Sequence, residues 1–398
     1  MAIDFQQVQS QVKQMGETAV QRSGELKGRR ESALGMLSKH AEDPERLVER
    51  VERIRREADP NLRCGVPAMK LERRPEPLNY RSPLPELPPS ASLLAADGSQ
   101  INPDRHAQAN FCMINVGAIQ MRLGLADAPQ VTIESRLVFD EEMFTPRGVI
   151  SEAQVALRRD LSERKRLSEL ASQAQPPVIT LTDGPMELWG GGDSQDRDDF
   201  AKSLDAYQEA LRSLCEIGAT TAGYVDKPSA NLVVRLLETA MLPEGGLREI
   251  KNFYPLRGVS DRWIYQRLLA PGERSAVFAI QSRSAAQYSG DLGLHFFYLN
   301  VGLPGNPWLA RVETPLWVAR DQKRLDDLQA VLFQQCQILG SRPYPYLIHR
   351  AHEAAVVSFE EKEQISEMIV RELLSRGVEL DSFSAKQSIK NLDKRTRL

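Results

Sequence analysis

The sequence predicts an α/β protein in which helices flank a mixed sheet and an N-terminal helical arm precedes it. Strand-like and helix-like patterns alternate after residue 91, which is typical of a layered α/β sheet. Residues 1 to 75 carry apolar side chains at helical spacing, and a proline-rich stretch follows them. The 398 residues, 41% of them hydrophobic, are enough to bury a substantial core.

The arm is expected to hold two helices separated near Pro44. Leu47, Val51 and Ile54 mark the apolar face of the second helix. A projecting helix pair cannot bury both faces by itself, so we expect a solvated arm that serves in dimerisation or partner docking. Residues 76 to 90 form an extended linker, since a run of prolines prevents a helix there. These prolines are Pro75, Pro77, Pro83, Pro85, Pro88 and Pro89.

From residue 91 onward we assign one domain, residues 91 to 392, followed by a basic tail at 393 to 398. Strands are expected at 91–97, 109–118, 131–139, 177–183, 219–225, 276–282, 294–300 and 308–318. Helices are expected at 151–173, 197–217, 229–240, 321–339 and 347–376, whereas 241–275 gives weak signals. Basic residues near the end are either contacts to a nucleic-acid backbone or part of a solvated terminus. They are Lys386, Lys390, Lys394, Arg395 and Arg397.

The composition argues against several classes of protein. The formal net charge of -3 means that any grip on an acidic polymer must come from local basic patches. No apolar run approaches the ~18 residues of a membrane span, and the start of the chain is polar, so we expect a cytoplasmic protein without membrane contact. The cysteines lack CxxC spacing, which argues against a zinc ribbon, an iron-sulfur site or a disulfide framework. They are Cys64, Cys112, Cys215 and Cys336.

Two apolar strands run into an Asp-Gly pair, at Asp97 and at Asp183. Each carboxylate would lie at a strand end, where a turn opens and a ligand can approach. If the strands are neighbours, the two carboxylates converge, and converging oxygen ligands suit Mg²⁺ or Mn²⁺. Asp-Gly is also a common turn dipeptide, so neither pair by itself indicates catalysis.

The helix before the second strand carries Glu163 within the span of its apolar face, whereas Glu169 points to water. A carboxylate on a buried face needs a metal or a cation as partner. A buried ion pair or a boundary position would explain Glu163 equally well, and Glu152 remains an alternative as the site glutamate.

Three further residues are candidates for the site. Lys227 stands between a strand and a helix, where it could meet a phosphate with help from the helix N-terminus, although a plain surface lysine is the simpler interpretation. His352 follows a Pro-Tyr-Pro segment that begins a helix, and Tyr344 lies in that segment. Beside two aspartates, a histidine can bind a metal or transfer a proton; by itself it would more simply be a core histidine.

The order of these motifs resembles that of the NurA nuclease domain over roughly residues 90 to 392. Each motif alone is weakly specific, and their succession carries the resemblance. The motifs are Asp97-Gly98-Ser99, a helix with Glu163, Asp183-Gly184, Lys227 after a strand, Arg311-Val312-Glu313, and Tyr344-Pro345 followed by Ala351-His352. Pro185 departs from the serine that the family often has.

The resemblance implies an RNase H-like core and a homodimer that degrades DNA with Mn²⁺ or Mg²⁺ in end resection and repair. It also implies 5′–3′ exonuclease activity, endonuclease activity on single-stranded DNA, and a hexameric HerA-type ATPase as partner. By the same resemblance Asp97, Asp183, Glu163 and His352 are metal-binding and catalytic residues, Tyr344 is catalytic, and Lys227 contacts the substrate phosphate. We expect Arg311 and Glu313 to serve structure or strand guidance.

Two other functions remain open from the sequence. A non-catalytic dimeric adaptor could guide DNA for the ATPase, although it would need neither aspartate nor His352. A different RNase H-like hydrolase could act on RNA, because a sequence does not show contacts to the 2′-hydroxyl.

Overall fold

The computed structural model describes residues 3–104, 107, 109–145, 148–190 and 197–378. The chain divides into two compact units. The first unit comprises Met1–Pro88, Gly184–Glu187 and Ala222–Tyr344, and the second comprises Pro89–Asp183, Leu188–Thr221 and Pro345–Leu398. The division into arm, linker, domain and tail stays a prediction, and the basic tail lies outside the described residues.

The second unit is built on four strands in the order β8-β3-β4-β5. Strands β3 (Ala91–Ile101), β4 (Cys112–Leu123) and β5 (Gln130–Val138) form an antiparallel meander, and β8 (Val178–Asp183) pairs parallel with β3. Leu93, Leu94, Ala95 and Ala96 are all 0% exposed, because β3 is covered on both faces. A continuous apolar run is what such a strand requires.

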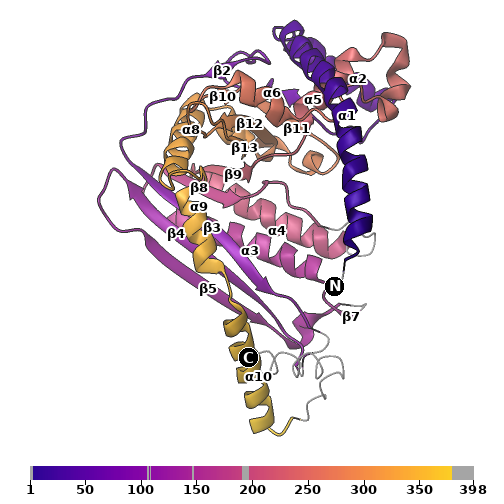
Figure 1. Cartoon of the computed structure of the whole chain (residues 1–398). Coiled ribbons are helices and arrows are strands. Elements are labelled where there is room, and N and C mark those ends of the chain that lie inside the picture. The colour runs from indigo at the N-terminus through magenta and orange to yellow at the C-terminus, as the bar shows by residue number, and fades with distance from the viewer. Residues whose placement is uncertain (1–2, 105–106, 108, 146–147, 191–196, 379–398) are drawn as a thin grey trace. The chain divides into compact units, whose positions relative to one another are not determined.

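Helices cover both faces of this sheet (Figure 1). Helices α3 (Glu152–Gln173) and α4 (Arg197–Glu216) pack on each other, and α3 lies on β3 and β4. Helix α9 (Tyr346–Ala355) lies on the other face of the same strands. Ser151 caps α3 through a capping box with Gln154. The remaining elements of this unit are η1 (Asp140–Met143), β6 (Phe144–Thr145), β7 (Gly148–Val149) and α10 (Phe359–Ser375).

Five strands of the first unit pair in the order β1-β11-β12-β13-β9, and each neighbouring pair is antiparallel. They are β1 (Cys64–Pro67), β11 (Phe278–Gln281), β12 (Leu294–Asn300), β13 (Leu309–Pro315) and β9 (Thr220–Asp226). The first two residues of β9 group with the second unit. Short strands β2 (Arg81–Ser82) and β10 (Arg274–Ser275) pair with each other, and β10 also pairs with β12. The helices are α1 (Phe5–Lys39), α2 (Pro44–Glu57), α5 (Leu232–Met241), η2 (Glu244–Asn252), α6 (Asp261–Leu268), η3 (Ala285–Gln287), η4 (Gly290–Leu292), α7 (Leu316–Ala319) and α8 (Gln322–Gln337).

The helical arm is less solvated than expected. Both predicted helices exist, and Pro44 begins the second, where a missing N–H costs nothing. Leu47, Val51 and Ile54 are buried, because α2 packs on β1 and α5 within the first unit. The exposed part is the beginning of α1, where Phe5 is 64% exposed.

Two other expectations are wrong in detail. Strand β3 does not end at Asp97 but continues to Ile101, because β4 supplies hydrogen-bonded partners along that whole length. The single helix expected at 347–376 is two helices, since α9 ends at Ala355 and Ser358 caps a new helix through a capping box. The expected fold class, a mixed α/β sheet flanked by helices and preceded by N-terminal helices, is confirmed.

No helix in the described part of the chain is long and apolar enough to cross a membrane. All four cysteines are free thiols. Cys64, Cys112 and Cys336 are buried and Cys215 is partly exposed.

Candidate active site

The centre of the candidate site is a hydrogen bond between Asp97 on β3 and His352 on α9. His352 Nδ1 lies 2.7 Å from Asp97 Oδ2, and Asp97 Oδ1 accepts the backbone N–H of Gly98 at 2.9 Å. The Asp97 side chain is 16% exposed and that of His352 is 61% exposed. The carboxylate is therefore held in place while the imidazole faces solvent. If Nδ1 carries the proton, Nε2 is free to accept one.

His352 can reach Asp97 because α9 lies directly on β4. Gly117, the cross-strand partner of Asp97, has no side chain, and a Cβ there would lie 2.6 Å from the backbone O of Ala351 and from the backbone N of Ala355. The end of α9 is also tied to the sheet, since Asn115 Nδ2 donates to Ala355 O at 2.8 Å. Glycine thus permits the approach and the amide fixes its position.

Asp183 lies beside Asp97 by strand register. Strands β3 and β8 are parallel and pair Ala96 with Thr182, so the next pair in register is Asp97 with Asp183, on strands roughly 4.8 Å apart. Thr182 accepts a hydrogen bond from Arg164 of α3, which shows that Thr182 faces α3. Successive residues of a strand alternate, so Asp183, which is exposed, points to the opposite side, as Asp97 does.

Glu163 approaches the same strands from the α3 side. It is buried beneath Gly98, where a Cβ would lie 2.6 Å from Glu163 Oε1. Burial, together with the negative charges of Asp160 and Asp97, raises the pKa of Glu163 to about 8, against the opposing effect of the arginines. The nearest cation is Arg159, whose Nε lies 3.4 Å from Glu163 Oε1. The charge of Asp97 therefore acts on Glu163, although the two side chains lie on opposite faces of the sheet.

The two alternative glutamates lie away from Asp97. Glu169 is 58% exposed and pairs with Arg166 at 3.2 Å, and Glu152 is exposed in the first turn of α3. Among the three glutamates considered, Glu163 is the one that lies against β3, at Gly98. Its role stays a prediction.

Two residues of α3 were missed by the sequence analysis. Asp160 lies one turn before Glu163, and burial raises its pKa although Arg159 pairs with it at 2.8 Å. Arg164 is 2% exposed and donates to Thr182 Oγ1 at 3.0 Å and Thr221 Oγ1 at 3.2 Å. Helical spacing from the buried Leu157 and Leu167 would have placed Arg164 on the apolar face.

Lys227 and Tyr344 belong to the first unit. Lys227 is exposed at the end of β9 with a positive φ of 42°, and its Nζ lies 3.8 Å from the ring centroid of Trp308. Trp308 is fixed in turn by a hydrogen bond from its Nε1 to Asp226 at 2.7 Å. Tyr344 packs edge-on against Tyr224 with ring centroids 5.6 Å apart.

The helix N-terminus expected to assist Lys227 is already occupied. The first backbone N–H groups of α5, at Val233 and Val234, donate to the carboxylate of Asp261 at 2.8 and 2.7 Å. That end of α5 therefore offers no free anion site, and the expected assistance to Lys227 is wrong. A phosphate role for Lys227 itself stays a prediction.

Arg311 and Glu313 form a buried pair on β13. Arg311 Nε donates to Glu313 Oε1 at 2.9 Å, and Glu313 Oε2 accepts the backbone N–H of Met186 at 2.9 Å. This carboxylate thus fixes the segment that follows Asp183, at Pro185 and Met186, which agrees with the structural role expected for the pair.

The donor types fit a hard divalent cation. Asp97 and Asp183 offer carboxylate oxygens, the ligands that Mg²⁺ and Mn²⁺ prefer. Among the described residues, no three acidic, histidine or cysteine side chains gather closely enough to hold an ion. The fit to a metal rests on the type of these donors alone, and Asp97 and Asp183 are the residues that would hold it.

A family model and several solved structures match this chain. Residues 91–357 match the NurA domain, whereas no curated protein matches the chain. A crystal structure of NurA with manganese is 11% identical with a TM-score of 0.40, covering 73% of this chain and 90% of that one. A second NurA crystal structure is 10% identical with a TM-score of 0.32, covering 73% and 89%. The catalytic domain of human endonuclease V is 13% identical with a TM-score of 0.30, covering 70% and 83%.

The matched segment spans more than half of the chain and includes Asp97, Glu163, Asp183, Lys227, Tyr344 and His352. The resemblance stated from the order of the motifs is thereby confirmed, and the chain belongs to the NurA family.

Proposed function

We propose that this protein is a metal-dependent nuclease that hydrolyses the phosphodiester bonds of DNA. The observation that carries the proposal is the 2.7 Å contact between Asp97 and His352, with Asp183 next to Asp97 in strand register. An acidic pair beside an exposed, oriented imidazole is an arrangement suited to hydrolysis. A purely structural role would not need an imidazole that faces solvent.

In this mechanism His352 acts as a proton acceptor. Asp97 holds the Nδ1 side of the ring, which leaves Nε2 to take a proton from the attacking water. Asp97 and Asp183 would hold Mn²⁺ or Mg²⁺, which when bound supplies Lewis-acid activation and charge neutralisation at the phosphate. The contact with the Trp308 ring holds the ammonium of Lys227 for a substrate phosphate, and Tyr344 positions the strand.

We further propose that the protein acts as a cytoplasmic homodimer with a HerA-type hexameric ATPase in DNA end resection. Its activities are 5′–3′ exonuclease on DNA ends and endonuclease on single strands. The support is family membership together with the net charge of -3, which suits weak intrinsic affinity for DNA. In this scheme, threading by the ATPase supplies the processivity.

The test is degradation of end-labelled single- and double-stranded DNA with Mn²⁺, next to labelled RNA. We expect Asp97→Asn and Asp183→Asn to lose about 100-fold or more of the activity while remaining folded. Glu169→Gln is the control, because it makes the same carboxylate-to-amide change at an exposed residue that lies away from Asp97. Cleavage of RNA but not DNA would contradict the proposed substrate. A folded wild type that is inactive with its ATPase as well would favour a DNA-guiding adaptor.

A further inference from the structure

The first unit contains a cavity of about 480 Å³ between α2, the β1 segment, and the region from β11 to β12. This volume lies in the range of sites for small organic molecules, roughly 300 to 1,000 Å³. Apolar side chains from all of these elements line it: Val51, Val66, Ile280 and Leu294. Polar side chains also line the cavity, and those without a partner in the protein are informative about a ligand.

His295 of β12 is one of the buried polar groups at the cavity. It is 6% exposed, and its Nδ1 donates to the carbonyl of Gly293 at 2.9 Å. Burial, together with the positive charge of Lys70, lowers the pKa of His295 to about 4, so the ring is neutral and Nε2 is a hydrogen-bond acceptor. Nε2 has no partner among the described residues, and it is not among the polar atoms sealed from solvent. It therefore presents an unused acceptor to the cavity.

Arg55 and Lys70 supply the positive charge at the same cavity. The Nε of Arg55 is buried without a hydrogen-bond partner. Among the described residues neither side chain forms an ion pair, and Glu52 is the one carboxylate that lines the cavity. A buried polar group without a partner is costly, so a cation in this position indicates an anionic ligand.

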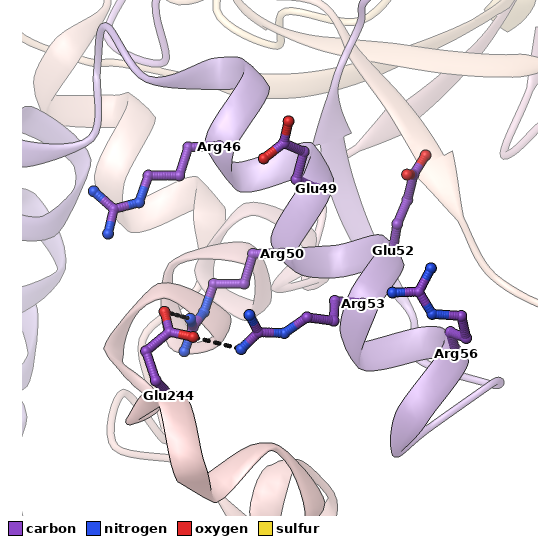
Figure 2. Close-up of a pocket in the computed structure, with 7 residues that line it drawn as sticks. All are labelled: Arg46, Glu49, Arg50, Glu52, Arg53, Arg56 and Glu244. Carbon is purple, nitrogen blue, oxygen red and sulfur yellow. Dashed lines mark hydrogen bonds and ion pairs between the residues drawn. The ribbon is translucent and has the colours of Figure 1, made fainter.

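Two arginines elsewhere on α2 have a carboxylate partner, although the Nε of Arg53, like that of Arg55, is buried without a hydrogen-bond partner. Figure 2 shows a second cavity, of about 380 Å³, in which Arg50 and Arg53 both point to Glu244. Arg50 Nη1 lies 2.6 Å from this carboxylate, and Arg53 pairs with its other oxygen. Two of the four arginines that line the second cavity are thus paired with Glu244, whereas Arg55 forms no ion pair among the described residues.

We infer that the cavity beside His295 binds a small organic anion of the mononucleotide class. The base would lie between the apolar walls and donate an N–H to His295 Nε2, and the phosphate would meet Arg55 and Lys70. The carboxylate of a fatty acid can pair with Arg55 and Lys70, but a fatty acid has no N–H to donate to His295. Inorganic phosphate can pair with the same cations, but it has no apolar part to contact the walls of the cavity. Only the source of the ligand rests on the proposed function, since hydrolysis of DNA releases mononucleotides; the recognition chemistry is independent of it.

The test is isothermal titration calorimetry of the full chain with deoxyadenosine and deoxycytidine monophosphates in EDTA. We expect deoxyadenosine, inorganic phosphate and octanoate each to bind at least about tenfold more weakly, because each lacks one recognised group. Arg55→Met keeps the aliphatic stem and is expected to weaken nucleotide binding about tenfold or more. Arg56→Met is the matched control, because Arg56 is the next residue, lines the second cavity and pairs only with Glu57 at 3.4 Å.

His295→Phe removes the acceptor while retaining a ring, and it should weaken the nucleotides but leave octanoate unchanged. The inference is overturned if the folded wild type binds no nucleotide, if octanoate binds as tightly as the nucleotides, or if Arg55→Met and Arg56→Met have equal effects. Asp97→Asn separates the two proposals. It is expected to abolish nuclease activity and to leave nucleotide binding intact, so either result can fail without the other.

Discussion

Replacing Gly117 by alanine should separate His352 from Asp97. The new Cβ would lie 2.6 Å from the backbone of α9, at Ala351 and Ala355, and backbone atoms cannot rotate away as a side chain can. Moving them to the ordinary contact distance of 3.4 Å shifts the helix by about 0.8 Å. Overpacking of this kind costs about 1 to 3 kcal/mol of stability.

The same shift acts on the candidate site. Gly117 is the cross-strand partner of Asp97, and the 2.7 Å contact from His352 has little room to lengthen before it is lost. A displacement of about 1 Å can cost about 100-fold in rate, so we expect a loss of that order in nuclease activity per folded molecule.

Hydrogen exchange at the amides of α9 measures the first effect, and degradation of labelled DNA measures the second. The matched control is Gly245→Ala, since a Cβ at Gly245 meets nothing within 4 Å and should change stability by less than about 0.5 kcal/mol. The reasoning would be refuted if the α9 amides of the Gly117→Ala variant exchanged at the wild-type rate and the variant kept full nuclease activity.

Two further predictions concern stability. Glu76→Ala should cost about 3 to 5 kcal/mol, because Arg274, which is 0% exposed, would lose the carboxylate that it holds at 2.9 and 3.1 Å. Urea unfolding would test this, with Glu72→Ala as the control, because Glu72 is exposed and lies 4.0 Å from Arg320. Equal losses of the free energy of unfolding in the two variants would contradict the prediction. Burial raises the pKa of Asp261 from 3.8 to about 6. The folded state therefore binds the proton of this carboxyl group more tightly than the unfolded state does, and the free energy of unfolding should fall as the pH rises from about 4 to about 6. Asp261→Asn should reduce this dependence in urea unfolding at several pH values, and an unchanged slope would disprove the assignment.

Much of the candidate site could be predicted from local patterns. The apolar runs that precede Asp97 and Asp183 identify two strands, and helical spacing places Glu163 on the buried side of α3 and Glu169 in solvent. Each of these inferences depends on neighbours within about two turns or one strand. Local periodicity suffices because it reflects which face of an element is buried.

Other features depend on contacts that no local pattern contains. Strand β3 runs past Asp97 because β4 continues to pair with it, which also removes the turn expected at Asp97-Gly98. There Gly98 instead leaves space for Glu163. The N-terminus of α5 is occupied by Asp261, which comes from a separate helix, so the free anion site expected beside Lys227 is absent.

The sequence by itself determined the alternation of strands and helices, the candidate carboxylates, and the succession of motifs that indicated the NurA family. Only the tertiary structure decided which of these groups meet. Asp97 and His352 are 255 residues apart, and their contact depends on Gly117 and Asn115, which set how closely α9 lies on the sheet. The physical reason is that periodicity records whether a side chain is buried, whereas the identity of its partner depends on the packing of distant elements.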